Sequence, residues 1–277
     1  MPEQTPPGGP QARRPPAIRS LGDPLARRSP FLFWAFGWYL RWLFWRRFNA
    51  VRIARTGLPQ APAGPLIICT NHPSWWDPVF FILLQTLVFP GRAGFGPMDA
   101  VSLGKYRLLE RMGVFGIELE SRRGAARFLE TSGRILAKPS SVLWITAQGA
   151  LTDARDRPIR LRPGIAHLLR RAPGATVLPL AMEYSFWNEG KPEALARFGA
   201  PIVAGRGRSV AEWTVLLESE LTRTADALAA DSLRRDKRLF TRLMQGSAAV
   251  GPMYGVYRRL RALATGQALD VSHGGHE

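Results

Sequence analysis

The sequence contains only one cysteine, Cys69, among its 277 residues. A single thiol cannot build a disulfide framework, and it cannot supply a zinc or iron–sulfur centre that needs several cysteines. We therefore expect the catalytic part of the chain to lie where thiols stay reduced, as on the cytosolic side of a bacterial or organellar membrane. Cys69 itself is predicted to be a buried strand residue and not a nucleophile.

Acidic residues and lysines are also few. The chain has 21 Asp and Glu against 38 Lys and Arg, so its formal net charge is +17. Arginine supplies most of the positive charge, because the lysines are only Lys105, Lys138, Lys191 and Lys237. Excess positive charge suits a polyanion, either nucleic acid or an anionic membrane surface. Since no RNP, helix-turn-helix or zinc-finger pattern accompanies the charge, we favour the membrane and expect no nucleic acid partner.

Several catalytic motifs are missing from the sequence. It has no G-x-S-x-G elbow and no G-x-x-x-x-G-K-[ST] loop, and residues 94–97 lack the third glycine of a dinucleotide fingerprint. His167, His273 and His276 have no cluster of further ligand residues around them, so no metal site is expected. These absences argue against a serine hydrolase of the elbow type, a P-loop NTPase and a dinucleotide-binding enzyme.

The first 48 residues divide into two parts. Residues 1–29 are rich in proline and arginine and poor in apolar residues, so they are predicted to form a basic disordered tail without the features of a signal peptide. Residues 30–48 include the aromatic run FLFWAFGWYLRWLFW, which is shorter than the roughly 20 apolar residues of a spanning helix. Tryptophan, tyrosine and arginine suit the lipid headgroup level, so this segment is predicted to be an interfacial helix. A buried core helix and a tilted span are the alternatives.

From Pro65 onward, short apolar runs alternate with helical patterns, which predicts an α/β fold with a mostly parallel or mixed central sheet flanked by helices. The expected strands are 66–70, 93–96, 115–119, 142–146 and 176–182. The expected helices are 78–89, 102–111, 124–137, 164–171 and 209–230. Residues 49–235 form the predicted catalytic domain and 236–277 a C-terminal basic helical segment. Its stretch 251–265 is either a second membrane contact or a packed terminal helix.

The stretch 66–84, LIICTNHPSWWDPVFFILL, carries the candidate catalytic residues. His72 follows the carboxyl end of a predicted strand, which is where open α/β sheets place ligands. Asp77 precedes Pro78 and is predicted to be the N-cap of the next helix. A loop that turns back over four residues also allows Asp77 to accept a hydrogen bond from one ring nitrogen of His72. The other nitrogen then remains free as a base.

Residues 71–77, Asn-His-Pro-Ser-Trp-Trp-Asp, resemble the N-H-x4-D block of the glycerolipid acyltransferases. Four later segments resemble further blocks of that superfamily in the same order, namely 113–119, 145–151, 160–166 and 177–182. The resemblance covers about residues 66–182. It implies that His72 is the catalytic base, that Asp77 orients it, that Asn71 contributes to substrate binding and that acyl transfer is direct.

The second block departs from the superfamily pattern. Leu119 stands where these enzymes have an arginine that helps to bind the acceptor's phosphate, and Arg122 and Arg123 follow closely. The resemblance therefore makes Arg122 and Arg123 candidate substrate-binding residues, since guanidinium groups bind phosphate in a bidentate manner. The alternative is that both lie at the solvated start of a helix.

The third block departs more strongly. Gly149 is retained, but Gln148 replaces the glutamate of F-P-E-G-T-R, and Ala150 and Leu151 replace its Thr-Arg pair. Gln148 and Gly149 are predicted to bind substrate, with backbone amides near Gly149 stabilising the oxyanion. Recognition of the acceptor is expected to differ from that of the phosphate-binding enzymes.

Together these features predict a membrane-associated O-acyltransferase, similar to 1-acylglycerol-3-phosphate acyltransferases of phospholipid biosynthesis. The donor would be acyl-CoA or acyl carrier protein, no cofactor is needed, and the acceptor would be a lysophospholipid or another lipid hydroxyl. Phe80, Phe81 and Leu84 either line the acyl groove or pack in the core. The expected location is the cytoplasmic face of a bacterial inner membrane. The alternatives are a glycolipid or amino-lipid acceptor, and a degenerate, non-catalytic membrane-binding protein of the same fold.

Overall fold

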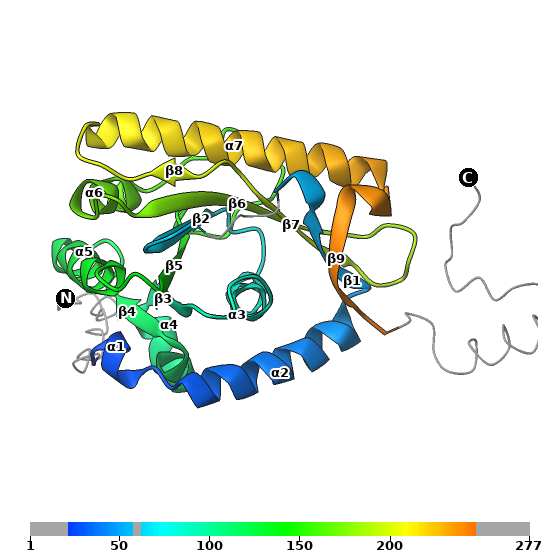
Figure 1. Cartoon of the computed structure of the whole chain (residues 1–277), viewed down its shortest axis with the longest axis horizontal. Coiled ribbons are helices and arrows are strands. Elements are labelled where there is room, and N and C mark those ends of the chain that lie inside the picture. Colours follow the sequence, from blue (N-terminus) through cyan, green and yellow to red (C-terminus); the bar gives the residue numbers. More distant parts are fainter. Residues whose placement is uncertain (1–21, 58–61, 248–277) are drawn as a thin grey trace, which may run out of the picture.

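A nine-stranded sheet lies between two layers of helices in the computed structural model, which describes residues 22–57 and 62–247 (Figure 1). The strands are β1 (Ala50–Ala54), β2 (Leu66–Thr70), β3 (Ala93–Asp99), β4 (Val114–Ile117), β5 (Ser141–Thr146), β6 (Thr176–Ser185), β7 (Glu193–Phe198), β8 (Ile202–Val203) and β9 (Phe240–Gln245). The helices are α1 (Pro24–Arg27), α2 (Pro30–Arg47), α3 (Asp77–Val88), α4 (Ala100–Lys105), α5 (Arg122–Leu136), α6 (Gly164–Arg171) and α7 (Val210–Arg234). Short 3-10 turns are η1 (Arg55–Gly57), η2 (Arg107–Met112) and η3 (Lys237–Leu239).

The sheet has the strand order β4-β3-β5-β2-β6-β7-β1-β9, with β8 paired to β6. Strand β2 lies between β5 and β6 and runs parallel to both. The pairs β6–β7, β6–β8 and β1–β9 are antiparallel, so the predicted mixed sheet is confirmed. Because Thr70 at the end of β2 pairs with Thr146 at the end of β5, the loops that follow these two strands leave the sheet side by side.

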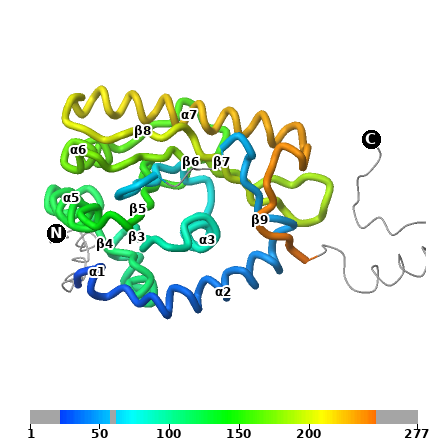
Figure 2. The backbone as a smooth tube through the Cα atoms, viewed as in Figure 1, coloured from blue at the N-terminus to red at the C-terminus, as the bar shows by residue number. Residues whose placement is uncertain are grey.

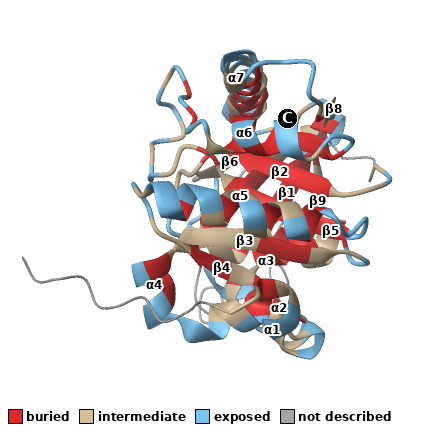
Figure 3. Cartoon of the chain, turned by 90° about the vertical axis from the view of Figure 1, so that its left-hand side faces the viewer, coloured by how far each residue is buried: buried red, intermediate tan, exposed pale blue. Residues whose placement is uncertain are grey.

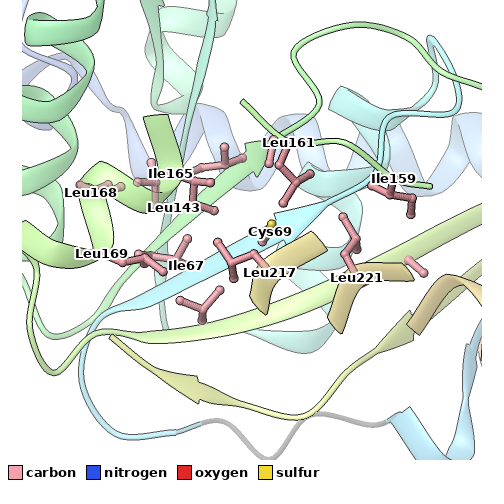
Figure 4. Close-up of a cluster of buried hydrophobic side chains, with 14 of the residues drawn as sticks. Ile67, Cys69, Leu143, Ile159, Leu161, Ile165, Leu168, Leu169, Leu217 and Leu221 are labelled. Atoms are coloured by element: carbon pink, nitrogen blue, oxygen red, sulfur yellow. The ribbon is translucent and has the colours of Figure 1, made fainter. Parts of the chain in front are cut away.

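The sheet buries both of its faces, as its apolar central strands require. In β2, Ile67 and Cys69 pack in a cluster with α5, α6 and α7, part of which Figure 4 shows. The alternating residues Leu66 and Ile68 pack in a second cluster with α2 and α3. Figure 3 shows the buried strands enclosed by helices whose outer faces are exposed. Helices α2 and α7 therefore lie on opposite sides of the molecule (Figure 2).

All five predicted strands and four of the five predicted helices are present. The strand over 66–70 and the helix over 164–171 have the predicted bounds, and the others have shifted ends. The helix expected over 102–111 is instead divided into α4 and η2, because Tyr106 leaves the helical conformation with φ −121° and ψ 54°. Strands β1, β7, β8 and β9 were not predicted.

Two terminal predictions need correction. Residues 22–29, assigned to the disordered tail, form α1 and the N-cap of α2; Asp23 caps α1 and pairs with Arg134, and Arg27 pairs with Glu110. Residues 236–247, assigned to a helical segment, form η3 and strand β9, which pairs with β1. The remaining parts of both predictions, residues 1–21 and 248–277, lie outside the described residues.

The aromatic segment forms helix α2 as predicted, and the helix has two different faces. Phe33, Gly37, Leu40 and Phe44 are buried at helical spacing. The large side chains exposed along α2 are Phe31, Trp34, Trp38, Tyr39, Trp42 and Trp45. Within residues 22–57 and 62–247, no helix combines the length and hydropathy that crossing a membrane requires.

Candidate active site

A cavity of about 1420 Å³ lies beside the carboxyl ends of β2 and β5, and His72 is part of its wall. Apolar side chains of α2 and α3 form one side, including Phe36, Leu40, Val79 and Ile82. The other walls come from β3, the α4–η2 segment, the start of α5 and the loop after β5. The cavity is therefore a largely apolar space with His72 in its wall.

Asn71 fixes the chain where it leaves β2. Its side-chain Nδ2 donates to the carbonyl oxygen of Met182 at 3.0 Å, and the backbone N–H of Met182 donates to Asn71 Oδ1 at 2.9 Å. Asn71 is buried and does not line the cavity. The sequence predicted Asn71 as a substrate-binding residue, and this prediction is wrong, because both polar atoms of the amide bind β6.

The loop after β5 holds the backbone of His72 from two sides. The N–H of His72 donates to Gln148 Oε1 at 3.0 Å, and the N–H of Thr152 donates to the carbonyl oxygen of His72 at 2.9 Å. Gln148 was predicted to bind substrate; its side-chain oxygen binds the backbone of His72, and Gln148 is not among the residues that line the cavity. The residue that departs from the glutamate of the resembled block is thus connected directly to His72.

His72 and Asp77 form the predicted pair. His72 Nδ1 lies 2.6 Å from Asp77 Oδ2, and the carboxylate is fully buried, whereas the imidazole is 20% exposed. A carboxylate at Nδ1 favours the tautomer that is protonated there, which leaves the lone pair on Nε2 as a base. The predicted contact is confirmed. The predicted N-cap role is wrong, because Asp77 is the first residue of α3 and Trp76 occupies the cap position.

Two further donors bind the Asp77 carboxylate. The N–H of Ser74 donates to Oδ2 at 3.0 Å, and the Tyr184 hydroxyl donates to Oδ1 at 2.8 Å. Burial and the charge of Asp77 raise the pKa of Tyr184 well above its usual value, so the phenol keeps its proton. No sequence motif connected Tyr184 with Asp77, because Tyr184 lies near the end of β6, 107 residues after Asp77.

Gly149 makes a turn at the cavity wall. Its φ is +72°, in the left-handed region that glycine adopts without strain, and its N–H donates to the carbonyl oxygen of Thr146 at 3.1 Å. The predicted oxyanion role therefore cannot rest on the amide of Gly149 itself, since that amide is already bonded. Gly149 still lines the cavity beside His72.

The rim of the cavity carries both cations and leucines. Arg122 lines it at the start of α5, whereas Arg123 is exposed and is not part of the wall. Lys105 and Arg107, which the sequence analysis did not single out, also line it. Leu119 and Leu151 line the same rim and are 43% and 61% exposed. The rim can therefore accept an amphipathic molecule.

The three residues predicted either to line an acyl groove or to pack in the core lie on two different faces of α3. Phe80 and Leu84 are fully buried in the core between α3 and the sheet. Phe81 lines the cavity and stacks on Trp144 at 5.3 Å between ring centroids. The core interpretation is therefore right for two of these residues, and the groove interpretation fits Phe81.

Cys69 is buried in β2 on the opposite side of the sheet from α3. Burial raises the pKa of its thiol to about 12, so the thiol stays protonated at physiological pH. Because the thiolate is the nucleophilic form of cysteine, the prediction that Cys69 is not a nucleophile agrees with its surroundings.

Comparison with known proteins gives a family match and a likeness to solved structures. Residues 52–183 match the family model described as Acyltransferase. Among solved structures, the chain is similar to the 1-acyl-sn-glycerophosphate (LPA) acyltransferase PlsC from Thermotoga maritima. The two are 16% identical with a TM-score of 0.44, over 72% of this chain and 78% of that one. No curated protein matches this chain.

Proposed function

Because residues 52–183 match the family model described as Acyltransferase, we propose that the chain is a glycerolipid acyltransferase, which transfers a fatty acyl group from a thioester to a hydroxyl of a lipid acceptor. The observation that carries this proposal is the His72–Asp77 pair, whose histidine is part of the wall of an apolar cavity. A large apolar cavity suits an acyl chain, and a histidine with a free Nε2 suits the activation of a hydroxyl.

In the proposed reaction, Nε2 of His72 takes the proton of the acceptor hydroxyl while the hydroxyl oxygen attacks the thioester carbonyl carbon. The new C–O bond forms, the C–S bond breaks, and the leaving thiolate receives the proton from His72. Asp77 stabilises the imidazolium while it carries that proton. General-base help of this kind contributes about 10²–10⁴-fold to the rate.

We propose acyl-CoA or acyl carrier protein as the donor, because both present an acyl thioester. The acceptor is a lysophospholipid or another lipid with a free hydroxyl, and the cations Lys105 and Arg122 at the rim favour an anionic one. Leu119 and Leu151 favour a second candidate, a glycolipid or amino-lipid without a phosphate, because they line the rim where a phosphate would need donors.

We also propose that helix α2 places the enzyme on an anionic membrane, at the cytoplasmic face of a bacterial inner membrane. Its exposed aromatic side chains are of the kind that partition into the lipid headgroup region. Arg41 and Arg46 lie beside Trp38 and Trp42, respectively, and so add attraction to anionic lipid. The inner face of the same helix lines the cavity, so a lipid substrate would have a short path from the membrane to His72.

The catalytic proposal is tested with His72→Ala. Cells or vesicles with the wild-type chain should accumulate one acylated lipid, detected by mass spectrometry, and the variant should lower its formation by about 10²-fold or more. Unchanged thermal unfolding and vesicle binding of the variant would show that only the chemistry is lost. A variant with near-normal activity would contradict the mechanism, and a wild-type chain without any acyl transfer would support the degenerate membrane-binding protein.

The membrane proposal is tested with a double variant of the exposed face of α2, Trp34→Ser with Trp38→Ser. The matched control is Val215→Ser with Leu233→Ser, which removes two exposed apolar side chains from α7 on the opposite side of the molecule. We expect the tryptophan variant to bind anionic vesicles at least about tenfold more weakly, because it lacks two exposed side chains that would become buried in the lipid on binding. Equal binding by both double variants would contradict the proposed role of α2.

A further inference from the structure

We propose that Tyr184 is a positioning residue for the His72–Asp77 pair, and this inference rests on the proposed function. Its hydroxyl holds the Asp77 carboxylate in the one orientation that presents Oδ2 to the imidazole. Tyr184 lies in β6, outside the segment that contains the pair, so the sheet itself would set the geometry of the base.

Each oxygen of the carboxylate has its own partners. Oδ2 receives the N–H of Ser74 at 3.0 Å and lies 2.6 Å from His72 Nδ1. Oδ1 receives the Tyr184 hydroxyl at 2.8 Å. The Asp77 side chain is fully buried, so without Tyr184 the oxygen Oδ1 would be a buried charged atom that has lost this donor. The carboxylate would then gain by turning toward other donors and would leave Nδ1.

Tyr184 is itself held firmly. Its backbone pairs with Ala194 of β7, and its ring lies 5.8 Å from the rings of both Phe48 and Phe80. The phenol also remains a hydrogen-bond donor, because burial and the nearby charge of Asp77 raise the pKa of Tyr184 well above its usual value. A fixed, protonated hydroxyl against a buried carboxylate is the arrangement that a positioning role requires.

The chain offers a closely matched control one residue earlier in β6. Ser232 of α7 donates to Glu183 Oε1 at 2.8 Å, so Ser232→Ala also removes a hydroxyl that binds a carboxylate at the same distance. Ser232 lies in α7, whereas Tyr184 packs against the residues of α3 and α2, so the two hydroxyls serve opposite faces of the sheet. Tyr184→Phe and Ser232→Ala therefore each remove one hydrogen bond from a hydroxyl to a carboxylate. Only the bond removed by Tyr184→Phe involves the His72–Asp77 pair.

We expect Tyr184→Phe to lower kcat for acyl transfer about tenfold or more while changing KM less than about twofold, because the misplaced base slows proton transfer without altering the cavity. Ser232→Ala should keep the wild-type kcat. In proton NMR, the low-field signal of the His72 Nδ1 proton should be present in the wild type, absent in His72→Ala, shifted or broadened in Tyr184→Phe and unchanged in Ser232→Ala.

The outcomes separate this inference from the proposed function. Loss of activity in His72→Ala with wild-type kcat and an unchanged proton signal in Tyr184→Phe would overturn the positioning role alone. Absence of any His72-dependent acyl transfer would overturn the proposed function, and the proton signal would still test Tyr184. The double variant of Tyr184→Phe with Asp77→Asn gives a second test, measured at a temperature at which circular dichroism shows all variants to be folded. A positioning role predicts almost no further loss of rate in that background, and a full further loss would overturn it.

Discussion

Asn71 separates the end of β2 from His72, and both polar atoms of its amide bind the backbone of Met182. The side chain thus acts as an extra rung between β2 and β6 at the point where β2 ends. One residue further, Gln148 and Thr152 bind the backbone of His72. The imidazole is therefore carried on a loop that two separate segments of the chain, β6 and the loop after β5, hold in place.

Asn71→Ala should destabilise the fold, because it leaves the buried N–H and carbonyl of Met182 without these partners. Each such group costs about 1–3 kcal/mol when it is unpaired, so we expect the free energy of unfolding to fall by about 2 kcal/mol or more in urea titration. Asn188→Ala, an exposed asparagine on the loop after β6, should change it by no more than about 0.5 kcal/mol. Equal stability of the two variants would show that the hydrogen bonds between Asn71 and Met182 do not stabilise the fold.

At this scale, the sequence predicted the contact between His72 and Asp77, because their spacing of five residues is local. It did not predict the partners that hold them. Gln148 lies 76 residues from His72, Tyr184 lies 107 from Asp77, and Met182 lies 111 from Asn71. These contacts depend on the order of strands in the sheet, which no short motif contains. Asn71 and Gln148 were therefore assigned to substrate when they in fact bind the backbone.

Helix α2 packs in the core, which the sequence analysis gave as an alternative, and it also has an exposed aromatic face. Leu40 and Phe44 are fully buried against the sheet layer, and the Phe44 ring contacts Phe48, Trp76 and Phe80. The tryptophans project from the opposite side of the helix and are exposed. The helix is therefore part of the core, with an outer face that remains open to a partner.

Phe44→Ala should lower the free energy of unfolding by about 3–5 kcal/mol, because it creates a cavity in the core. Trp38→Ala, on the exposed face of the same helix, should lower it by no more than about 0.5 kcal/mol. Thermal or urea unfolding of the two purified variants measures this difference. If Phe44→Ala were as stable as Trp38→Ala, α2 would not be packed on the domain in solution.

The missed strands β1 and β7 show why element prediction stopped short of the whole sheet. Their sequences AVRIA and EALARF contain charged residues that usually mark exposed positions. Here Arg52 and Glu193 lie on neighbouring parallel strands, 2.9 Å apart and almost fully buried. Each charge is tolerated in the sheet because the other compensates it. A prediction from local sequence evaluates each charged residue separately, whereas in the folded chain the two residues form an ion pair.

At the scale of the whole molecule, the two faces of the sheet are covered by different helices. Helices α5, α6 and α7 close one face with an apolar cluster that contains Cys69. On the other face, α2 and α3 pack on the sheet and also form a wall of the cavity beside His72. Helices α2 and α3, which line the cavity, lie on the side of the molecule opposite α7 (Figure 1), and α2 also carries the exposed aromatic side chains.

The net charge of +17 and the aromatic face of α2 should contribute separately to membrane binding. Charge attraction is screened by salt, since the Debye length falls from about 10 Å at 0.1 M to about 3 Å at 1 M, whereas burial of tryptophan is not screened in this way. We expect vesicle sedimentation to show partial loss of binding to anionic lipid at 1 M salt, and retention on DNA to be lost completely. In the variant Trp34→Ser with Trp38→Ser, the remaining vesicle binding should be lost at 1 M salt as well. Stronger retention on DNA than on anionic vesicles at every salt concentration would instead identify the charge as a nucleic acid surface.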